Sequence, residues 1–300
     1  MRIGTLNMFQ QGIDSIIDRQ TDLFRTQQQL SSGKRINRPS DDPSGAAQLI
    51  GLSDSLDVTR QYQRNIDSLR SRLQLEDGSL AAVGDALQRA RELAVQGLND
   101  TYGPEERVGM ALEIRQIIDE VRGIANRTDG AGEYLFGGFR GQSAPFSDDG
   151  AGNFSYAGDQ GQRLIQVSAA RQIADGDSGF DVFMKIPAVG GGYEDVFSTL
   201  YTLATDLEAN APNGTSLEQI DNAMDNLLGF RASAGARLNA VERQETVNVA
   251  MIEQLENTRS IIEDLDYAEA ASRLNQQSVT LQAAQQAFIK VQNLNLFNFL

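Results

Sequence analysis

The two ends of this 300-residue chain carry apolar residues along narrow stripes, and this pattern constrains the fold more than any other feature of the sequence. Near the N-terminus the stripe repeats every three or four residues, or at multiples of that heptad step, at Leu6, Phe9, Ile13, Ile16, Leu23 and Leu30. Near the C-terminus the same spacing places Leu274, Leu281, Phe288 and Val291. A stripe of this width suits a long helix that packs lengthwise on another helix, and it is too thin to form a globular core alone. We therefore predict that both ends form long helices, which pair with one another or with neighbouring copies of the chain.

The C-terminal stripe continues into the apolar run "NLNLFNFL". Its apolar residues include Leu294, Leu296, Phe297 and Phe299. An exposed run of this kind is typical of a partner surface, because it would otherwise promote aggregation. The alternative is docking into the chain's own core, but the thin stripe that leads to the run cannot bury itself within one chain. We expect an intermolecular contact here.

The first helix is interrupted at "LSSGKRINRPSDDPSGAAQL", residues 30–49. The residues that define this connector are Gly33, Arg35, Pro39, Asp41, Asp42 and Pro43. Gly33 suits the left-handed residue just beyond a helix end, and Arg35 complements the negative pole of that helix. Asp42 followed by Pro43 is typical of an N-cap and the first position of a new helix. Pro39 keeps the residue before it out of the helical region, so we predict a loop between two helices.

The sequence offers few groups for catalysis or for binding metal. It contains no Cys and no His, which excludes thiol nucleophiles, His-dependent triads and the usual zinc sites. The adjacent Asp41 and Asp42 lack a third acidic residue at ligand spacing, so we expect one to cap a helix and the other to be solvated. The segment "DGDSG" at 175–179 lacks the acidic ladder of a calcium loop and is expected to be a β-turn. We predict no enzyme activity, no cofactor and no metal site.

The charge balance limits the partners of the chain. Its 41 acidic and 26 basic residues give a formal net charge of -15. This sign disfavours nucleic acid and anionic membrane surfaces, which attract clustered Lys and Arg. No stretch approaches the roughly 18 consecutive apolar residues of a membrane span. We therefore predict no nucleic-acid binding and no membrane insertion.

The middle of the chain differs from the ends in composition. Helical periodicity extends from residue 43 to about 128, and it returns near Asp195 with a break at "APNGTS". Between them glycines are frequent, and four short runs are expected as strands: "YLFGG", "NFSYAG", "RLIQVSA" and "FDVFMKI". We predict a mainly α fold with an inserted small antiparallel β domain. The expected domains are a terminal coiled coil of 1–42 with 256–300, a helical core of 43–140 with 193–255, and a β-rich domain of 141–192.

Several segments resemble the flagellin superfamily. The connector "LSSGKRINRPSDDPSGAAQL" is similar to the superfamily segment that joins the terminal helix to the next domain, and its "RPSDDP" is closer to hook-associated junction proteins than to filament flagellins. The segment "EYLFGGFRGQSAPF" at 133–146 resembles the entry of those junction proteins into their outer domain. The C-terminal "LDYAEAASRLNQQSVTLQAAQQAFIKVQNLNLFNFL" also matches the superfamily pattern. This resemblance implies a structural subunit of the bacterial flagellum.

The resemblance also implies an arrangement and a location. The paired termini would form the inner domain that lines an axial tube, and the β domain would face outward. The subunit would be exported unfolded through the flagellar type III apparatus, without a cleaved signal peptide, and would be extracellular at the hook–filament junction. Its implied partners are further copies of itself, the hook-side junction protein, flagellin and a cytoplasmic export chaperone.

Two other functions stay open on the sequence. Within the same superfamily, the chain could be a filament flagellin that polymerises into the filament itself. From another class, the β region of residues 141–195 could be a glycan-binding or hydrolytic module. We expect neither binding nor turnover by that region.

Overall fold

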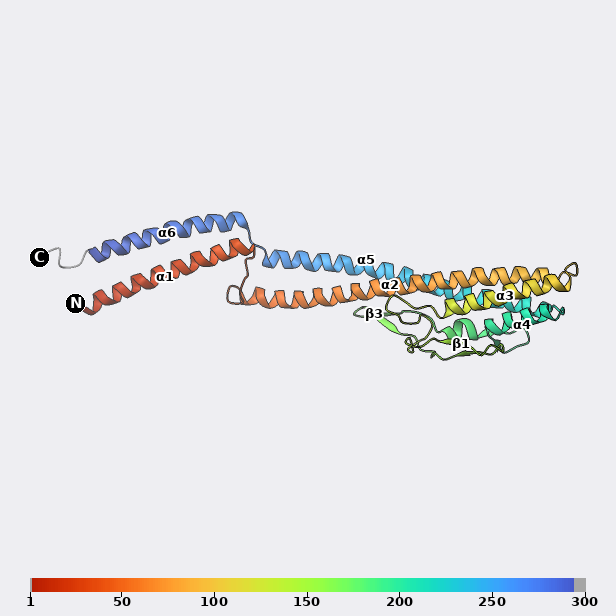
Figure 1. Cartoon of the computed structure of the whole chain (residues 1–300). Helices are drawn as coiled ribbons and strands as arrows, with labels where there is room; N and C mark the ends of the chain where they lie inside the picture. The colour runs from red at the N-terminus through yellow and green to blue at the C-terminus, as the bar shows by residue number, and fades with distance from the viewer. Residues whose placement is uncertain (1, 294–300) are drawn as a thin grey trace. The chain divides into compact units, whose positions relative to one another are not determined.

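The computed structural model describes the backbone of residues 2–293 and the side chains of residue 7 and residues 9–290. Its elements follow the predicted order of helices, short strands and helices (Figure 1). The helices are α1 (Arg2–Ser32), α2 (Pro43–Gly97), α3 (Pro104–Ala125), η1 (Phe180–Met184), α4 (Val196–Glu208), α5 (Gly214–Glu263) and α6 (Tyr267–Asn293). The strands are β1 (Phe146–Asp148), β2 (Phe154–Tyr156), β3 (Leu164–Ser168), β4 (Arg171–Ala174), β5 (Ile186–Pro187) and β6 (Tyr193–Glu194). The predicted fold class is confirmed.

The chain divides into two compact units. Met1–Val58 with Ala250–Leu300 form the terminal unit, and Thr59–Val249 form the central unit. Within residues 2–293 no helix combines the length and the apolarity needed to cross a membrane.

In the terminal unit, α1 and α6 lie side by side (Figure 1). The Phe9 and Phe288 rings are in contact at one end of the pair, and Gly33 lies against Tyr267 at the other. The two helices are therefore antiparallel. This is the pairing that their narrow apolar stripes predict.

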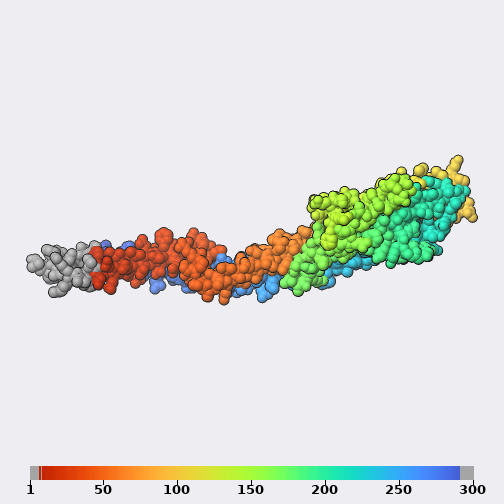
Figure 2. All heavy atoms as spheres, turned by 90° about the horizontal axis from the view of Figure 1, so that it is seen from below, coloured from red at the N-terminus to blue at the C-terminus, as the bar shows by residue number. Residues whose placement is uncertain are grey.

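The central unit contains most of the buried apolar side chains. The inward face of α2 carries Leu69, Leu73, Leu80 and Leu87, each at most 1% exposed, and α3 packs against α4. At the junction with the β region, Phe146 of β1 contacts Phe183 and Phe197, with ring centroids 5.4 Å apart in both pairs. Figure 2 shows the β region in yellow-green and α4 in blue-green forming one continuous face of this unit. The β region is thus part of the central hydrophobic core.

The strands form three separate two-stranded antiparallel sheets, β1–β2, β3–β4 and β5–β6. An isolated hairpin of this length is marginal in water, so each sheet depends on its packing against the helices. In β3–β4, Ile165 pairs with Ile173, and the register shifts between Gln166 and Ser168. The buried Val167 lies at this irregularity.

Two of the four predicted strands are wrong. The run "YLFGG" forms turns, in which Gly138 has a φ of +65°. Most of "FDVFMKI" is the π-helix η1, and only Ile186 at its end belongs to a strand. The consecutive Val182 and Phe183 are both buried, and a strand would place neighbouring side chains on opposite faces.

Candidate assembly surface

Some of the predicted seam residues of α1 and α6 are half-buried, and Phe9 contacts Phe288 across the helix pair. The Phe9 and Phe288 ring centroids are 4.8 Å apart with the planes tilted by 50°. Gly12 allows this contact, because a Cβ there would lie 3.0 Å from Cδ2 of Phe288. The half-buried seam residues are Ile16, Leu23 and Leu30 on α1 and Leu274, Leu281 and Phe288 on α6.

The shielded stripe of α1 is shifted from the predicted one. Ile13 remains 38% exposed, whereas Thr26 and Gln29 are 2% and 7% exposed. The Thr26 hydroxyl donates to the carbonyl of Asp22 at 3.1 Å, and Gln29 Nε2 donates to the carbonyl of Arg35 at 2.6 Å. These hydrogen bonds allow two polar side chains to be buried at positions that the sequence prediction did not include in the seam.

The terminal unit leaves most of its large apolar side chains unburied. Among its described residues, the buried apolar side chains are Ile36, Leu56, Leu265 and Ala270. Its exposed large apolar side chains are Phe9, Ile13, Ile17, Phe24, Ile50, Val58, Met251, Ile261, Tyr267, Val279 and Ile289. Two of them, Ile17 and Phe24, line the same groove, and exposed apolar side chains that cluster in this way are typical of a protein–protein contact. Sequence reasoning missed most of these residues, although Ile17 and Phe24 continue a second heptad line beside the predicted seam.

A groove lies beside this second line of apolar residues. It has a volume of about 440 Å³ and runs between α1 and the connector. Ile17 and Phe24 line it and are 52% and 69% exposed, while Arg38 and Asp41 form its polar side.

The side chains of Leu6 and Val291 lie outside the described residues. The predicted C-terminal contact also lies outside them, with Leu294, Leu296, Phe297 and Phe299.

The connector between α1 and α2 is hydrogen-bonded to the short connector between α5 and α6. Gly33 has a φ of +71°, as its position beyond the end of α1 predicts. Its carbonyl accepts a hydrogen bond from the Leu265 N–H at 3.0 Å, and the Arg35 N–H donates to the carbonyl of Glu263 at 2.6 Å. The Lys34 ammonium also forms an ion pair with Glu263. The two connectors therefore form one paired structure, which we call the clasp (residues 33–36 with 262–265).

The predicted role of Arg35 needs correction. Its guanidinium donates through Nη2 to the carbonyl of Ile262 at 2.7 Å, at the C-terminal pole of α5 and not of α1. Nη1 of the same guanidinium is 3.3 Å from Oδ2 of Asp42. Arg35 thus links the end of α5 to the start of α2 by satisfying a carbonyl that the helix leaves unpaired.

The two adjacent aspartates have separate structural roles. Asp42 Oδ1 accepts hydrogen bonds from the Gly45 N–H and the Ser44 hydroxyl, both at 2.9 Å, so it is the predicted N-cap of α2. The Gly45 N–H, followed by the Ser44 hydroxyl, lowers the pKa of the Asp42 carboxyl.

The expectation that Asp41 is simply solvated is wrong. Its Oδ2 accepts the N–H groups of Asn37 and Arg38 at 3.2 and 2.9 Å. Its Oδ1 lies 3.4 Å from Nε of Arg25 on α1. Pro39 lies in the turn that Asp41 closes, and Pro43 is the first residue of α2. Within the described side chains, no group of three or more acidic residues is arranged to hold a metal ion.

Two family models match the chain, and together they span both helical ends. The bacterial flagellin N-terminal helical region matches residues 3–140, and the bacterial flagellin C-terminal helical region matches residues 217–300.

The chain is also similar to individual flagellar proteins. It is 29% identical over 316 residues to flagellar hook-associated protein 3 of Escherichia coli strain K12, with 99% of each chain covered. It is 30% identical over 243 residues to the flagellar filament 30.7 kDa core protein of Treponema maltophilum, covering 80% of this chain and 78% of that protein. The crystal structure of the flagellar junction protein FlgL from Legionella pneumophila shares the fold, with a TM-score of 0.62, 20% identity, and coverage of 72% of this chain and 100% of that chain. The chain therefore belongs to the bacterial flagellin family, and like these relatives it is a structural flagellar protein and not an enzyme.

Proposed function

We propose that this chain joins the hook side of the bacterial flagellum to its flagellin filament and assembles with copies of itself through its terminal helices. The observation that carries this proposal is the similarity to flagellar hook-associated protein 3, which extends over 99% of both chains. The apolar side chains that the terminal unit leaves exposed support self-assembly, because further copies would bury them.

The proposal assigns a place to each part of the chain. Residues 1–42 with 256–300 form an inner domain, residues 43–140 with 193–255 a helical core, and residues 141–192 an outer domain. The neighbours of the assembled subunit are further copies, the hook-side junction protein and flagellin. A cytoplasmic chaperone holds the C-terminal segment before export through the flagellar type III apparatus, without a cleaved signal peptide, to the extracellular junction.

The seam and the connector have different roles in this proposal. The seam residues on α1 and α6, together with the C-terminal Leu294, Leu296, Phe297 and Phe299, make contacts between subunits. The connector residues, from Gly33 to Pro43, set the geometry between the inner domain and the helical core. The clasp supports this assignment, because it ties the two connecting segments together by backbone hydrogen bonds.

The terminal contact can be tested in a normally motile strain in which the gene for this protein is replaced by the variant. The double variant Ile17→Ser/Phe24→Ser changes two exposed side chains of the terminal unit, and we expect at least a tenfold loss of attached filaments with unchanged helicity. The matched control Val108→Ser/Leu112→Ser changes two exposed apolar side chains of α3 in the central unit, and it should retain its filaments. Normal filaments in the first variant, with loss in the control, would contradict assembly through the terminal unit.

The C-terminal contact is tested by removing residues 294–300. The truncated protein should keep its folded central unit, whose buried residues lie elsewhere, but should fail to join the hook tip. Attached filaments in cells that make only the truncated protein would show that these residues are not an assembly contact.

A filament flagellin is the second candidate, and it is favoured by the 30% identity to a flagellar filament core protein of Treponema maltophilum. The two functions differ in whether assembly terminates. Purified protein mixed with filament seeds should add a short cap and stop if it is a junction subunit. Long filaments built from this chain alone would overturn the junction proposal.

A further inference from the structure

The segment at residues 175–179, "DGDSG", is buried and is not the surface turn that its composition suggests. It connects β4 to η1 in the central unit. Asp175 and Asp177 are only 5% and 6% exposed, which is rare for aspartate unless each carboxylate is paired. Ser178 is 1% exposed, and its hydroxyl donates to the carbonyl of Asp159 at 3.2 Å. The segment is therefore held against the helices by its polar side chains.

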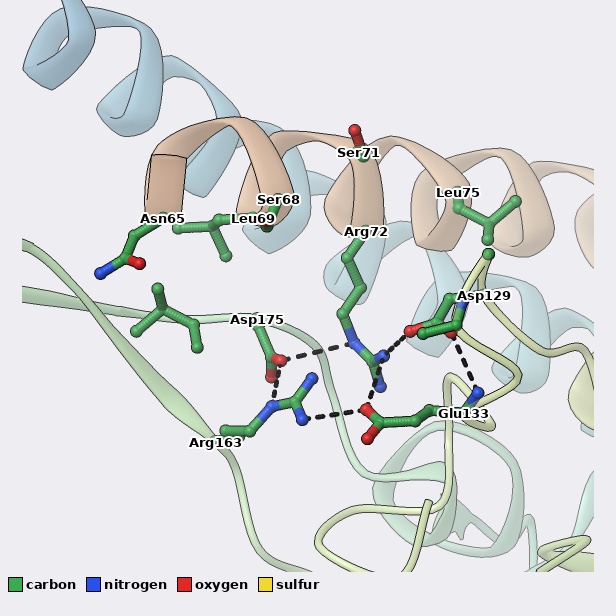
Figure 3. Close-up of a pocket in the computed structure, with 13 residues that line it drawn as sticks. Asn65, Ser68, Leu69, Ser71, Arg72, Leu75, Asp129, Glu133, Arg163 and Asp175 are labelled. Carbon is green, nitrogen blue, oxygen red and sulfur yellow. Dashed lines mark hydrogen bonds and ion pairs between the residues drawn. The ribbon is translucent and has the colours of Figure 1, made fainter. Parts of the chain in front are cut away.

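The first attachment is the carboxylate of Asp175. Figure 3 shows it between two guanidinium groups, those of Arg72 from α2 and of Arg163, the residue directly before β3. Asp175 Oδ2 lies 2.6 Å from Nε of Arg163 and 3.5 Å from Nε of Arg72. The same two arginines pair with Asp129 and Glu133 of the loop that follows α3. Two cations thus face three carboxylates, and these charges tie the loop, β3 and the 175–179 segment to α2.

The second attachment has a different charge balance. The Asp177 carboxylate forms an ion pair with Arg237 of α5, and Gln162 Nε2 donates to its Oδ1 at 2.9 Å. The Asp177 N–H donates to Oε1 of Glu76 at 2.8 Å. Glu76 lies on α2 and is 2% exposed. Two almost fully buried carboxyl groups therefore lie beside each other, and one guanidinium, paired with Asp177, is the cation of this site.

This second site contains two polar atoms without a hydrogen-bond partner among the described side chains, Oε2 of Glu76 and Nη1 of Arg237. A buried ionised carboxylate with an unpaired oxygen is costly, so the neutral acid is favoured. Burial, followed by the negative charge of Asp177, raises the pKa of Glu76 to about 8, and the Arg237 charge only partly opposes this.

We propose that Glu76, Asp177 and Arg237 form a proton-operated latch that holds the 175–179 segment, and with it the β region, on α2 and α5. With Glu76 protonated, the single charge of Asp177 balances Arg237. When Glu76 loses its proton, a second negative charge is buried beside Asp177 with no second cation in the latch. Arg72 pairs with Asp175 in the first attachment, and Arg127 donates to the hydroxyl of Ser79 on α2.

The direction of the pH effect follows from proton linkage. The folded latch binds a proton more tightly than the open state, in which the Glu76 carboxyl has its ordinary pKa of 4.5. The stabilisation is therefore complete below pH 4.5, declines as pH rises, and is lost at about pH 8. With a pKa of 4.5 in the open state and about 8 in the folded latch, the fraction of molecules with an open latch increases on the order of a hundredfold between pH 6 and pH 9.

The test uses the full-length protein and hydrogen–deuterium exchange, corrected for the intrinsic pH dependence of exchange. The reporters are the amides of Asp177 and Gly179, which donate to Glu76 and to the carbonyl of Phe136. We expect their protection to fall on the order of a hundredfold from pH 6 to pH 9. Glu76→Gln keeps the shape of the side chain but cannot ionise, so it should abolish this dependence. Glu120→Gln, on the exposed side of α3, is the matched control and should leave it unchanged.

A second variant keeps the proposal testable if Glu76→Gln does not fold. Asp177→Asn removes the other negative charge, so an ionised Glu76 can pair with Arg237 and the alkaline loss of protection should disappear. The proposal is overturned if wild-type protection is independent of pH. It is also overturned if the pH dependence persists in whichever of Glu76→Gln and Asp177→Asn folds.

Discussion

Replacing Arg35 by methionine tests the clasp that joins the two connectors. The substitution keeps most of the length of the side chain and removes the guanidinium. The variant loses the hydrogen bond to the Ile262 carbonyl at 2.7 Å and the ion pair with Asp42 at 3.3 Å. The backbone bond from residue 35 to Glu263 remains possible. The change therefore isolates what the charged side chain adds to the backbone pairing.

The expected magnitude follows from the two lost contacts. A hydrogen bond from a charged group to a carbonyl contributes about 1.5–3 kcal/mol, and an exposed ion pair less than about 1 kcal/mol. Because the Arg35 side chain is 46% exposed, solvent screens both contacts, and we expect a loss of about 1–2 kcal/mol. This loss should increase local opening of the clasp by roughly 5- to 30-fold.

The assay is hydrogen–deuterium exchange on the full-length protein. The reporting amide is that of Leu265, which donates to the Gly33 carbonyl at 3.0 Å. Arg38→Met in the same loop is the matched control, because Arg38 takes part in the connector through its backbone: its N–H donates to the Asp41 carboxylate and its carbonyl accepts from the Asp41 N–H. This control should change the exchange rate at Leu265 by less than twofold. An Arg35→Met variant with the wild-type exchange rate at Leu265 would refute the assignment of Arg35 as the side-chain link of the clasp.

Three further predictions concern other parts of the structure. Gly33→Ala should destabilise the end of α1 by about 1–2 kcal/mol because of its φ of +71°, and Gly33→Asn should recover part of this in exchange measurements on the Leu265 amide. Phe197→Ala removes a fully buried ring and should lower the unfolding free energy by about 3–5 kcal/mol in urea titrations, whereas Phe139→Ala, at a residue 68% exposed, should cost less than about 1 kcal/mol. The stabilisation of α2 by the Asp42 cap should be complete above pH 3.8 and should be lost as pH falls through the lowered pKa of the folded state. Hydrogen exchange at the Gly45 amide should therefore increase at low pH in the wild type but not in Asp42→Asn.

The local features of the connector could be predicted from the sequence. Gly33, Asp42 and Pro43 act on backbone groups within about four residues, so their neighbours in sequence are also their partners. Arg35 shows the limit of this reasoning. A rule based on the nearest helix assigns it to α1, but the carbonyl that it reaches is 227 residues away. No local pattern marks that partner.

The apolar pattern predicted the terminal helices better than their orientation. On α1, Ile13 belongs to the predicted seam while Ile17 and Phe24 form a neighbouring line, and a heptad spacing allows either to face a partner. Which line faces α6 depends on features that hydrophobicity does not report, such as the small Gly12 beneath Phe288. The buried Thr26 carries no apolar signal at all.

The buried ion pairs of the central unit could not be predicted from the sequence either, because their partners are also distant in the chain. Asp177 is stabilised by Arg237 and lies beside Glu76, which are 60 and 101 residues away. In isolation "DGDSG" has the composition of a solvated turn, because its partners come from two helices that the fold brings together. The π-helix η1 was missed because its β-branched and aromatic residues are typical of a strand. Only the burial of two consecutive apolar residues indicates a helix, and the sequence does not show burial.

The clasp also determines when the terminal unit can form. Its two backbone segments are residues 33–36 and 262–265, and α1 pairs with a helix that begins only at Tyr267. A chain that emerges in sequence order therefore offers α1 no partner until nearly all of it has been released. The buried apolar residues of the central unit, in contrast, are complete by Val241. Closing so long a loop is slow compared with contacts nearer in sequence. The two ends should therefore be the last part of the molecule to become ordered, and the part most available to other chains until then.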